Sequence, residues 1–163
     1  MNRRIQEIFT IAEGRYLTKE ESDHISQHAA SVAARLQAMQ EVLEKESAIV
    51  EGTMREVLRA YPDLEQKYRA ARPKGTRDIA LALRFATSAM VRNDPDALQA
   101  ELLSWFNTIL KGLGLAASFV EDTYKTLERI AARELSPDTM EKMSPFLSQL
   151  TIALSSRRSE GKE

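Results

Sequence analysis

The apolar residues of this 163-residue chain recur every three or four positions almost throughout, and no stretch alternates as a β-strand would. One stretch, from about Thr76 to Val91, is apolar nearly all round, and a helix of that kind is normally central in its fold. Glycines, prolines and capping residues divide the chain into about seven or eight short helices. The sequence therefore predicts an all-α domain of globin size.

Capping residues mark helix starts at three places, because a side-chain oxygen at the N-cap accepts the free N–H groups of the first turn. They are Thr18 with Glu21 in a capping box, Asp94 followed by Pro95, and Ser136 followed by Pro137. After the first start, apolar residues step by four and three, at Ile25, Ala29, Val32, Leu36, Met39 and Leu43. Such a narrow seam suits packing on another helix, either within the fold or in a coiled coil.

Residues 63–75 are the most polar and least periodic part of the chain, and we expect them to form its main loop. Trp105 lies on a leucine-rich face and is expected in the core. We interpret residues 1–156 as one domain, because this length can bury a substantial core. Residues 157–163 are expected to form a disordered tail.

Composition excludes several classes of function. Net charge is −1 with acidic and basic residues interleaved, so no basic stripe indicates nucleic-acid binding. No apolar run approaches the roughly 20 residues of a membrane span, and the N-terminus has a helical pattern that is not typical of a secretory signal. The chain has no cysteine, which excludes disulfides, thiol catalysis and thioether-linked cofactors and fits a cytoplasmic protein. No phosphate loop or nucleophile motif is present, so we do not expect an enzyme.

The polar start of the apolar helix carries the most specific pattern. Arg77-Asp78 is followed after five residues by Arg84-Phe85-x-Thr87. This segment resembles the central helix of the phycobiliproteins, in which Cys-x-Arg-Asp leads into an apolar helix containing Leu-Arg-Tyr-x-Thr. Four other places agree in order: Gly14-Arg15-Tyr16-Leu17, Tyr61-Pro62, Gly112-Leu113-Gly114-Leu115, and Met143 to Leu154-Ser155. The resemblance extends from about residue 3 to residue 156.

The resemblance implies a globin-like bundle with an extra N-terminal helical pair, within residues 1–35, that makes the subunit contact. It also implies a tetrapyrrole cleft beside the central helix. Asp78 would accept the pyrrole N–H groups of a bilin, Arg77 would hold one propionate, and Lys74 would be a second propionate partner. Apolar walls could come from Phe85, Met90, Phe119 and Tyr124.

The chain departs from the phycobiliprotein pattern at three places. Gly75 stands where the family has the cysteine that links the chromophore. The loop before Arg77 is shorter than the family's, and that loop helps to wall the cleft. The family pairs an acid on its N-terminal helices with the arginine at the Arg84 position across the subunit contact, but Ile11 occupies the acid's place and Glu13 lies two residues on. Self-association through apolar surface, as a homodimer, is therefore at least as plausible as the usual ion pair.

This combination is most similar to the cysteine-lacking relatives of phycobiliproteins called bilin biosynthesis-associated globins. The resemblance implies bilin-pathway enzymes or phycobiliprotein subunits as partners. It also places Arg84, Ile11, Glu13 and Tyr16 in the subunit contact. We expect no covalent chromophore, no haem and no metal.

Simpler interpretations of the same residues remain open. An acid in the first helical turn is stabilised by the helix dipole without any ligand, and Arg84 is expected to pair with an acid within the chain or across chains. His24 and His28 lie one helical turn apart and could share a metal, but a solvated helix face is the better interpretation.

Three functions remain as hypotheses. The first is a protein that binds or carries a bilin or another tetrapyrrole without a covalent bond. The second is a ligand-free scaffold that contacts bilin-pathway enzymes or phycobilisome subunits. The third is a globin-like sensor with a closed pocket.

Overall fold

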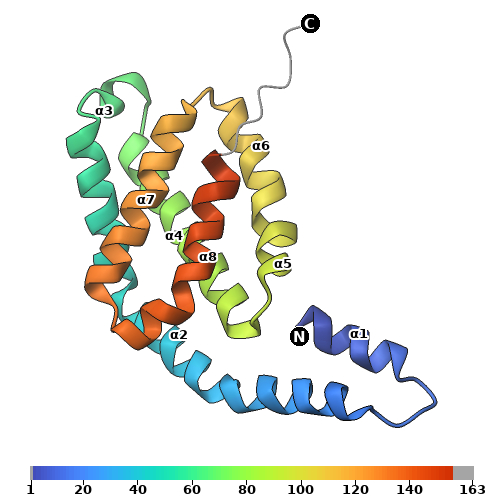
Figure 1. Cartoon of the computed structure of the whole chain (residues 1–163). Helices are drawn as coiled ribbons and strands as arrows, with labels where there is room; N and C mark the ends of the chain where they lie inside the picture. Colours follow the sequence, from blue (N-terminus) through green and yellow to red (C-terminus); the bar gives the residue numbers. More distant parts are fainter. Residues whose placement is uncertain (1, 156–163) are drawn as a thin grey trace, which may run out of the picture.

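The computed structural model describes residues 2–155, and the expected tail at residues 157–163 lies outside that range. No described residue belongs to a β-strand, which confirms the all-α prediction. The elements in chain order are α1 (Arg3–Ile11), α2 (Lys19–Ala60), α3 (Leu64–Lys67), α4 (Ala71–Arg92), α5 (Pro95–Leu98), the π-helical turn η1 (Gln99–Leu103), α6 (Ser104–Gly112), α7 (Ala117–Glu134) and α8 (Pro137–Ser155). Helices α2, α4, α7 and α8 pack together as the body of the molecule (Figure 1).

The predicted helix starts are confirmed. The Thr18 side chain accepts from the N–H of Glu21, and the Glu21 carboxylate accepts from the N–H of Thr18, which completes the capping box. Asp94 accepts from the N–H of Ala97 at the start of α5. At the start of α8 the Ser136 hydroxyl accepts from the N–H of Thr139. Local side-chain chemistry therefore determines where these helices begin.

Helix α2 is one element of 42 residues, so the prediction of uniformly short helices is wrong here. Residues 44–49, between its two apolar stripes, contain no glycine or proline that would end a helix. It runs along one side of the molecule and then curves up beside α4 and α7 (Figure 1). Gly52 lies where α2 crosses α7: a Cβ at this position would be 3.1 Å from Cγ2 of Ile130. This glycine therefore allows a close helix crossing.

The prediction of a loop over residues 63–75 is only partly correct. Helix α3 lies within it, and α4 begins at Ala71, five residues before the predicted start at Thr76. Pro73 is the third residue of α4, where its missing N–H costs no intrahelical bond, so it does not break the helix. Ala70 precedes the helix in the left-handed conformation, with φ of 61°.

Helix α4 is central, as the apolar pattern predicted. It packs against α2 and α8 and buries Ile79, Leu83, Ala86 and Met90. Full burial of a side chain such as Leu83 stabilises the fold by about 1.5–3 kcal/mol. The expectation for Trp105 is wrong: it is 41% exposed on α6, whose buried face is made instead by residues such as Phe106.

Helix α1 and the first part of α2 form a projection that we call the N-terminal arm, residues 3–34 (Figure 1). None of residues 13–34 is buried. The start of the arm is fixed to the body because the Asn2 side-chain amide donates to the carbonyl oxygens of Arg92 (3.2 Å) and Asn93 (2.5 Å). In return, the N–H of Arg3 donates to Asp94 at 3.0 Å.

The arm and the outer face of α2 carry exposed apolar side chains. On the arm, Phe9, Ile11 and Tyr16 are 53%, 65% and 97% exposed. The predicted seam on α2 continues this surface, because Leu36, Met39 and Leu43 are also exposed. Ile25 and Val32 of the seam are half-buried, but Leu36, Met39 and Leu43 stay exposed within residues 2–155, so packing within the fold does not explain the spacing of these three.

Candidate ligand cavity

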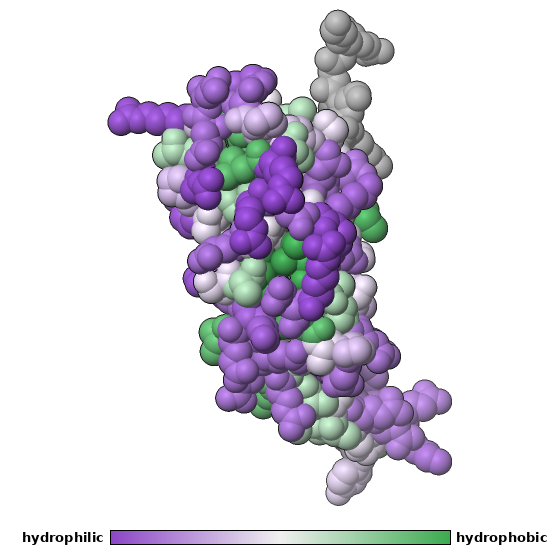
Figure 2. Space-filling model, turned by 90° about the vertical axis from the view of Figure 1, so that its left-hand side faces the viewer, coloured by the Kyte–Doolittle hydropathy of each residue, from purple (hydrophilic) through white to green (hydrophobic). Residues whose placement is uncertain are grey.

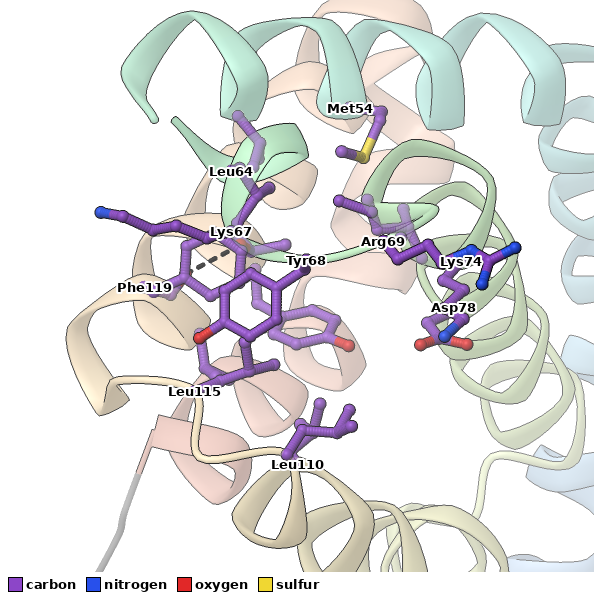
Figure 3. Close-up of a pocket in the computed structure, with 18 residues that line it drawn as sticks. Met54, Leu64, Lys67, Tyr68, Arg69, Lys74, Asp78, Leu110, Leu115 and Phe119 are labelled. Atoms are coloured by element: carbon purple, nitrogen blue, oxygen red, sulfur yellow. Dashed lines mark hydrogen bonds between the residues drawn. The ribbon is translucent and has the colours of Figure 1, made fainter. Parts of the chain in front are cut away.

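A cavity of about 310 Å³ lies beside the N-terminal half of α4. Its walls come from α2, from α3 and the residues that follow it, from α4, from the end of α6 and the turn after it, and from the first half of α7. In Figure 3, Asp78 and Lys74 on α4 lie on one side, and Tyr68 and Phe119 lie on the other. The cavity therefore has a polar wall opposite an apolar one.

Asp78 is the acid of the polar wall. One of its carboxylate oxygens, Oδ1, accepts from Nε and Nη2 of Arg77 at 3.1 and 2.9 Å. No donor among the described residues bonds to its other oxygen, and the side chain is 23% exposed. Asp78 thus retains one acceptor oxygen for a ligand N–H group.

The helix dipole does not account for Asp78. It is the eighth residue of α4, since the helix begins at Ala71, whereas the dipole acts mainly on the first turn. The simpler interpretation from the sequence assumed a helix that starts at Thr76 and is wrong at this point.

Tyr124 of α7 also lines the cavity and is 4% exposed. Burial raises the pKa of its phenol well above the usual value, and the nearby Asp78 carboxylate raises it further. No described residue forms a hydrogen bond with its hydroxyl. Tyr124 therefore places a neutral O–H group, able to donate or accept, in an otherwise apolar wall.

Three cations surround the cavity: Lys67, Arg69 and Lys74. Lys67 forms a loose, exposed ion pair with Asp63 at 3.8 Å. Arg69 and Lys74 form no ion pair with any described residue, and both are exposed. Cations without a protein partner can bind the carboxylates of a ligand.

The predicted binding residues are only partly brought together. Lys74 and Asp78 line the cavity, but Arg77 does not; its side chain is 75% exposed and faces a groove between α2 and α4. Gly75 also lines the cavity. Helix α3 and the residues after it supply Lys67, Tyr68 and Arg69, whose position could not be inferred without the course of the chain.

The apolar walls differ in a similar way from those considered in the sequence. Phe119 and Tyr124 line the cavity, whereas Phe85 and Met90 do not. Sequence reasoning missed the wall residues whose only signal is a place in an ordinary helical stripe or turn. These are Met54, Val57, Leu64, Ile79, Leu110, Leu113, Leu115, Val120 and Thr123.

The residues expected at a subunit contact lie in two places. Arg84 pairs with Glu46 of its own chain at 2.5 Å, which is one of the two alternatives that the sequence left open. Ile11, Glu13 and Tyr16 are all exposed on or beside the arm.

Figure 2 shows the face with α3 and the second half of α2, where apolar side chains lie between projecting hydrophilic ones.

Residues 2–155 contain neither a metal-binding cluster nor a membrane-spanning helix. No cluster of three or more histidine, aspartate or glutamate side chains is arranged to hold a metal ion. None of the described helices is long and apolar enough to span a membrane. His28 is half-buried, and its pKa is lowered by burial first and then by the positive charge of Arg35.

The helices and the cavity beside the central helix define an all-α, globin-like protein. The model of the phycobilisome protein family matches residues 11–154, which is most of the chain. The chain therefore belongs to the phycobilisome protein family. A search among curated proteins found no match.

Proposed function

We propose that this protein binds a bilin, or a closely related linear tetrapyrrole, without a covalent bond. The observation that carries the proposal is a cavity with an acid and a buried hydroxyl inside, and unpaired cations at its edge, in a chain without cysteine. A bilin presents pyrrole N–H groups, two carboxylates and a flat apolar body. Asp78 would accept the N–H groups, while Arg69 and Lys74 would bind the carboxylates.

The volume constrains how such a ligand lies. About 310 Å³ is near the lower end of the roughly 300–1,000 Å³ of small-molecule sites. We infer that the cavity encloses the middle of the ligand and that its carboxylates remain at the cationic edge, in contact with water. Partial enclosure without a thioether favours reversible binding, as in a cytoplasmic carrier that receives a bilin from, or passes it to, enzymes of bilin biosynthesis.

The test is a titration of the protein into biliverdin and into phycocyanobilin, followed by absorbance. We expect a shifted and sharpened visible band for the wild type. Asp78→Asn keeps the shape of the side chain but removes its charge, and a charge-assisted hydrogen bond contributes about 1.5–3 kcal/mol. We therefore expect the variant to bind roughly 10- to 100-fold more weakly.

Asp96→Asn is the matched control, because Asp96 is an exposed acid of α5 outside the cavity lining. It should bind like the wild type. An unchanged spectrum at saturating protein contradicts the proposal, and so does equal affinity of Asp78→Asn and Asp96→Asn.

We propose further that the chain self-associates through the arm. The exposed apolar side chains of the arm also favour the hypothesis of a scaffold protein. Phe9, Ile11 and Tyr16 offer apolar surface, and the groove between α2 and α4 contains apolar Val50 and Leu81 beside Arg84. In a two-fold dimer each arm would lie in the partner's groove, and each contact would occur twice. The same surface could instead bind phycobiliprotein subunits.

Light scattering after size-exclusion chromatography tests this arrangement. Ile11→Asp should give a monomer, because it buries a charge in the contact. Ile152→Asp is matched to it, since Ile152 is 66% exposed and Ile11 is 65% exposed, but Ile152 lies on α8. A monomeric wild type, or a dimer that survives Ile11→Asp, rules out self-association through the arm.

A further inference from the structure

Gly75 lies inside α4, where its backbone conformation does not require glycine. Its φ is not in the left-handed region, unlike that of Gly14 or Gly114. Glycine within a helix lowers stability relative to alanine. A residue with no conformational reason to be glycine therefore points to a limit on space.

Met54 of α2 provides that limit. A Cβ at position 75 would lie 2.8 Å from its sulfur and 3.3 Å from its methyl carbon, which is closer than unstrained atoms approach. Met54 is 3% exposed and lines both the cavity and the groove between α2 and α4. Its side chain is thus the partition between these two spaces, and its thioether lies where a side chain from position 75 would begin.

We propose that Met54 is the residue that determines the depth of the cavity and the size of the ligand, by filling the space that an anchoring side chain at position 75 would occupy. This inference rests on the proposed function, because it concerns the same ligand. In Figure 3 the Met54 side chain points from α2 toward the space between Asp78 and the apolar wall. A ligand that enters there contacts the thioether.

The chemistry of methionine fits this role. Its side chain is unbranched and polarisable, adapts to irregular gaps and makes favourable contacts with aromatic rings. A flat conjugated ligand therefore finds a surface that can adjust to it. The same flexibility predicts the effect of bulk at position 75: a methyl group there displaces the end of Met54 into the cavity.

A double-mutant cycle tests the inference with Gly75→Ala, Met54→Ala and the combined variant. Gly75→Ala should change the melting temperature by no more than about 5 °C, because the higher helix propensity of alanine offsets the displacement of the flexible end of Met54. It should also weaken biliverdin binding about tenfold, because the cavity loses depth. The combined variant should bind within about threefold of Met54→Ala, since the clash is gone.

Gly112→Ala is the control, because a Cβ at Gly112 meets nothing within 4 Å and Gly112 is not part of the cavity lining. A second probe separates failure of this inference from failure of the proposed function. The dye 1-anilinonaphthalene-8-sulfonate is flat, aromatic and anionic, and its fluorescence reports on the cavity whether or not a bilin binds.

Suppose that the wild type does not shift the absorbance of biliverdin, but that the affinity for the dye changes among the variants as predicted for biliverdin. Bilin binding is then ruled out, and the role of Met54 stands. If the dye and biliverdin bind Gly75→Ala as tightly as the wild type, Met54 is only a packing residue and the inference is wrong. Equal behaviour of Gly75→Ala and Gly112→Ala in every measurement also overturns it.

Discussion

Asn2 holds α1 to the body, and its replacement gives a sharp test of how the arm is ordered. The side chain is 8% exposed, accepts from the N–H of Ile5 at 3.2 Å as the N-cap of α1, and donates to the carbonyl oxygens of Arg92 and Asn93. A nine-residue helix is not stable alone in water, so α1 depends on such attachments.

Asn2→Ala removes the cap, which contributes about 1 kcal/mol, and two side-chain hydrogen bonds of about 1 kcal/mol each. The opening equilibrium of α1 should therefore shift by up to about 3 kcal/mol, or roughly 100-fold. Hydrogen exchange measured by mass spectrometry should show faster exchange in residues 3–11. Peptides from α4 and α8 should change far less, because their core is untouched.

Asn2→Ser separates the two contributions, since serine keeps a capping oxygen but is too short to reach the carbonyl oxygens of Arg92 and Asn93. It should give an intermediate increase in exchange. The reasoning is refuted if Asn2→Ala changes exchange in residues 3–11 less than about threefold. It is also refuted if the whole chain exchanges faster to the same degree, because α1 would then belong to the same cooperative unit as the core.

Three further changes test individual features. Ala70→Gly should stabilise the protein by about 0.5–1 kcal/mol, because glycine adopts the left-handed conformation at φ 61° without strain; a higher urea midpoint at an unchanged slope would show this. Gly52→Ala places a methyl group 3.1 Å from Cγ2 of Ile130 and should lower the melting temperature by about 3 °C or more, with partial recovery on adding Ile130→Leu, because leucine lacks the Cγ2 methyl group. The Arg15 guanidinium, and then the N–H of Thr18, lower the pKa of Glu21 to about 2, so an NMR titration of Arg15→Gln should show that pKa rising toward its usual range. Because the folded pKa is the lower one, this contribution to stability is complete above the pKa of unfolded Glu21 and is lost as pH falls toward 2.

Helix starts could be predicted because their causes are local. Thr18, Asp94 and Ser136 each bond to the turn that follows, so a few adjacent residues carry the whole signal. The start of α4 was missed because its first turn contains the exposed residues Arg72, Pro73 and Lys74, which show no apolar repeat. The exposed Trp105 shows the limit of an apolar stripe, which does not reveal how far the neighbouring helices extend over it.

The cavity could be predicted only where the resemblance supplied a position. Asp78 and Lys74 were found in this way, and both line the cavity. Arg69 could not be found because its contribution depends on how α3 and the left-handed Ala70 direct the chain toward the cavity edge. Met54 could not be found because it is one residue of an ordinary apolar stripe, and only its distance to Gly75 distinguishes it.

The continuity of α2 has a mechanical consequence. The seam residue Leu36 and the cavity residue Met54 belong to one uninterrupted helix, 18 residues apart, which corresponds to about 27 Å at 1.5 Å per residue. No loop between them can absorb a change in position. A molecule in the cavity and a partner bound to the seam would therefore be held at a fixed spacing and orientation. Either could move relative to the other only if α2 bends.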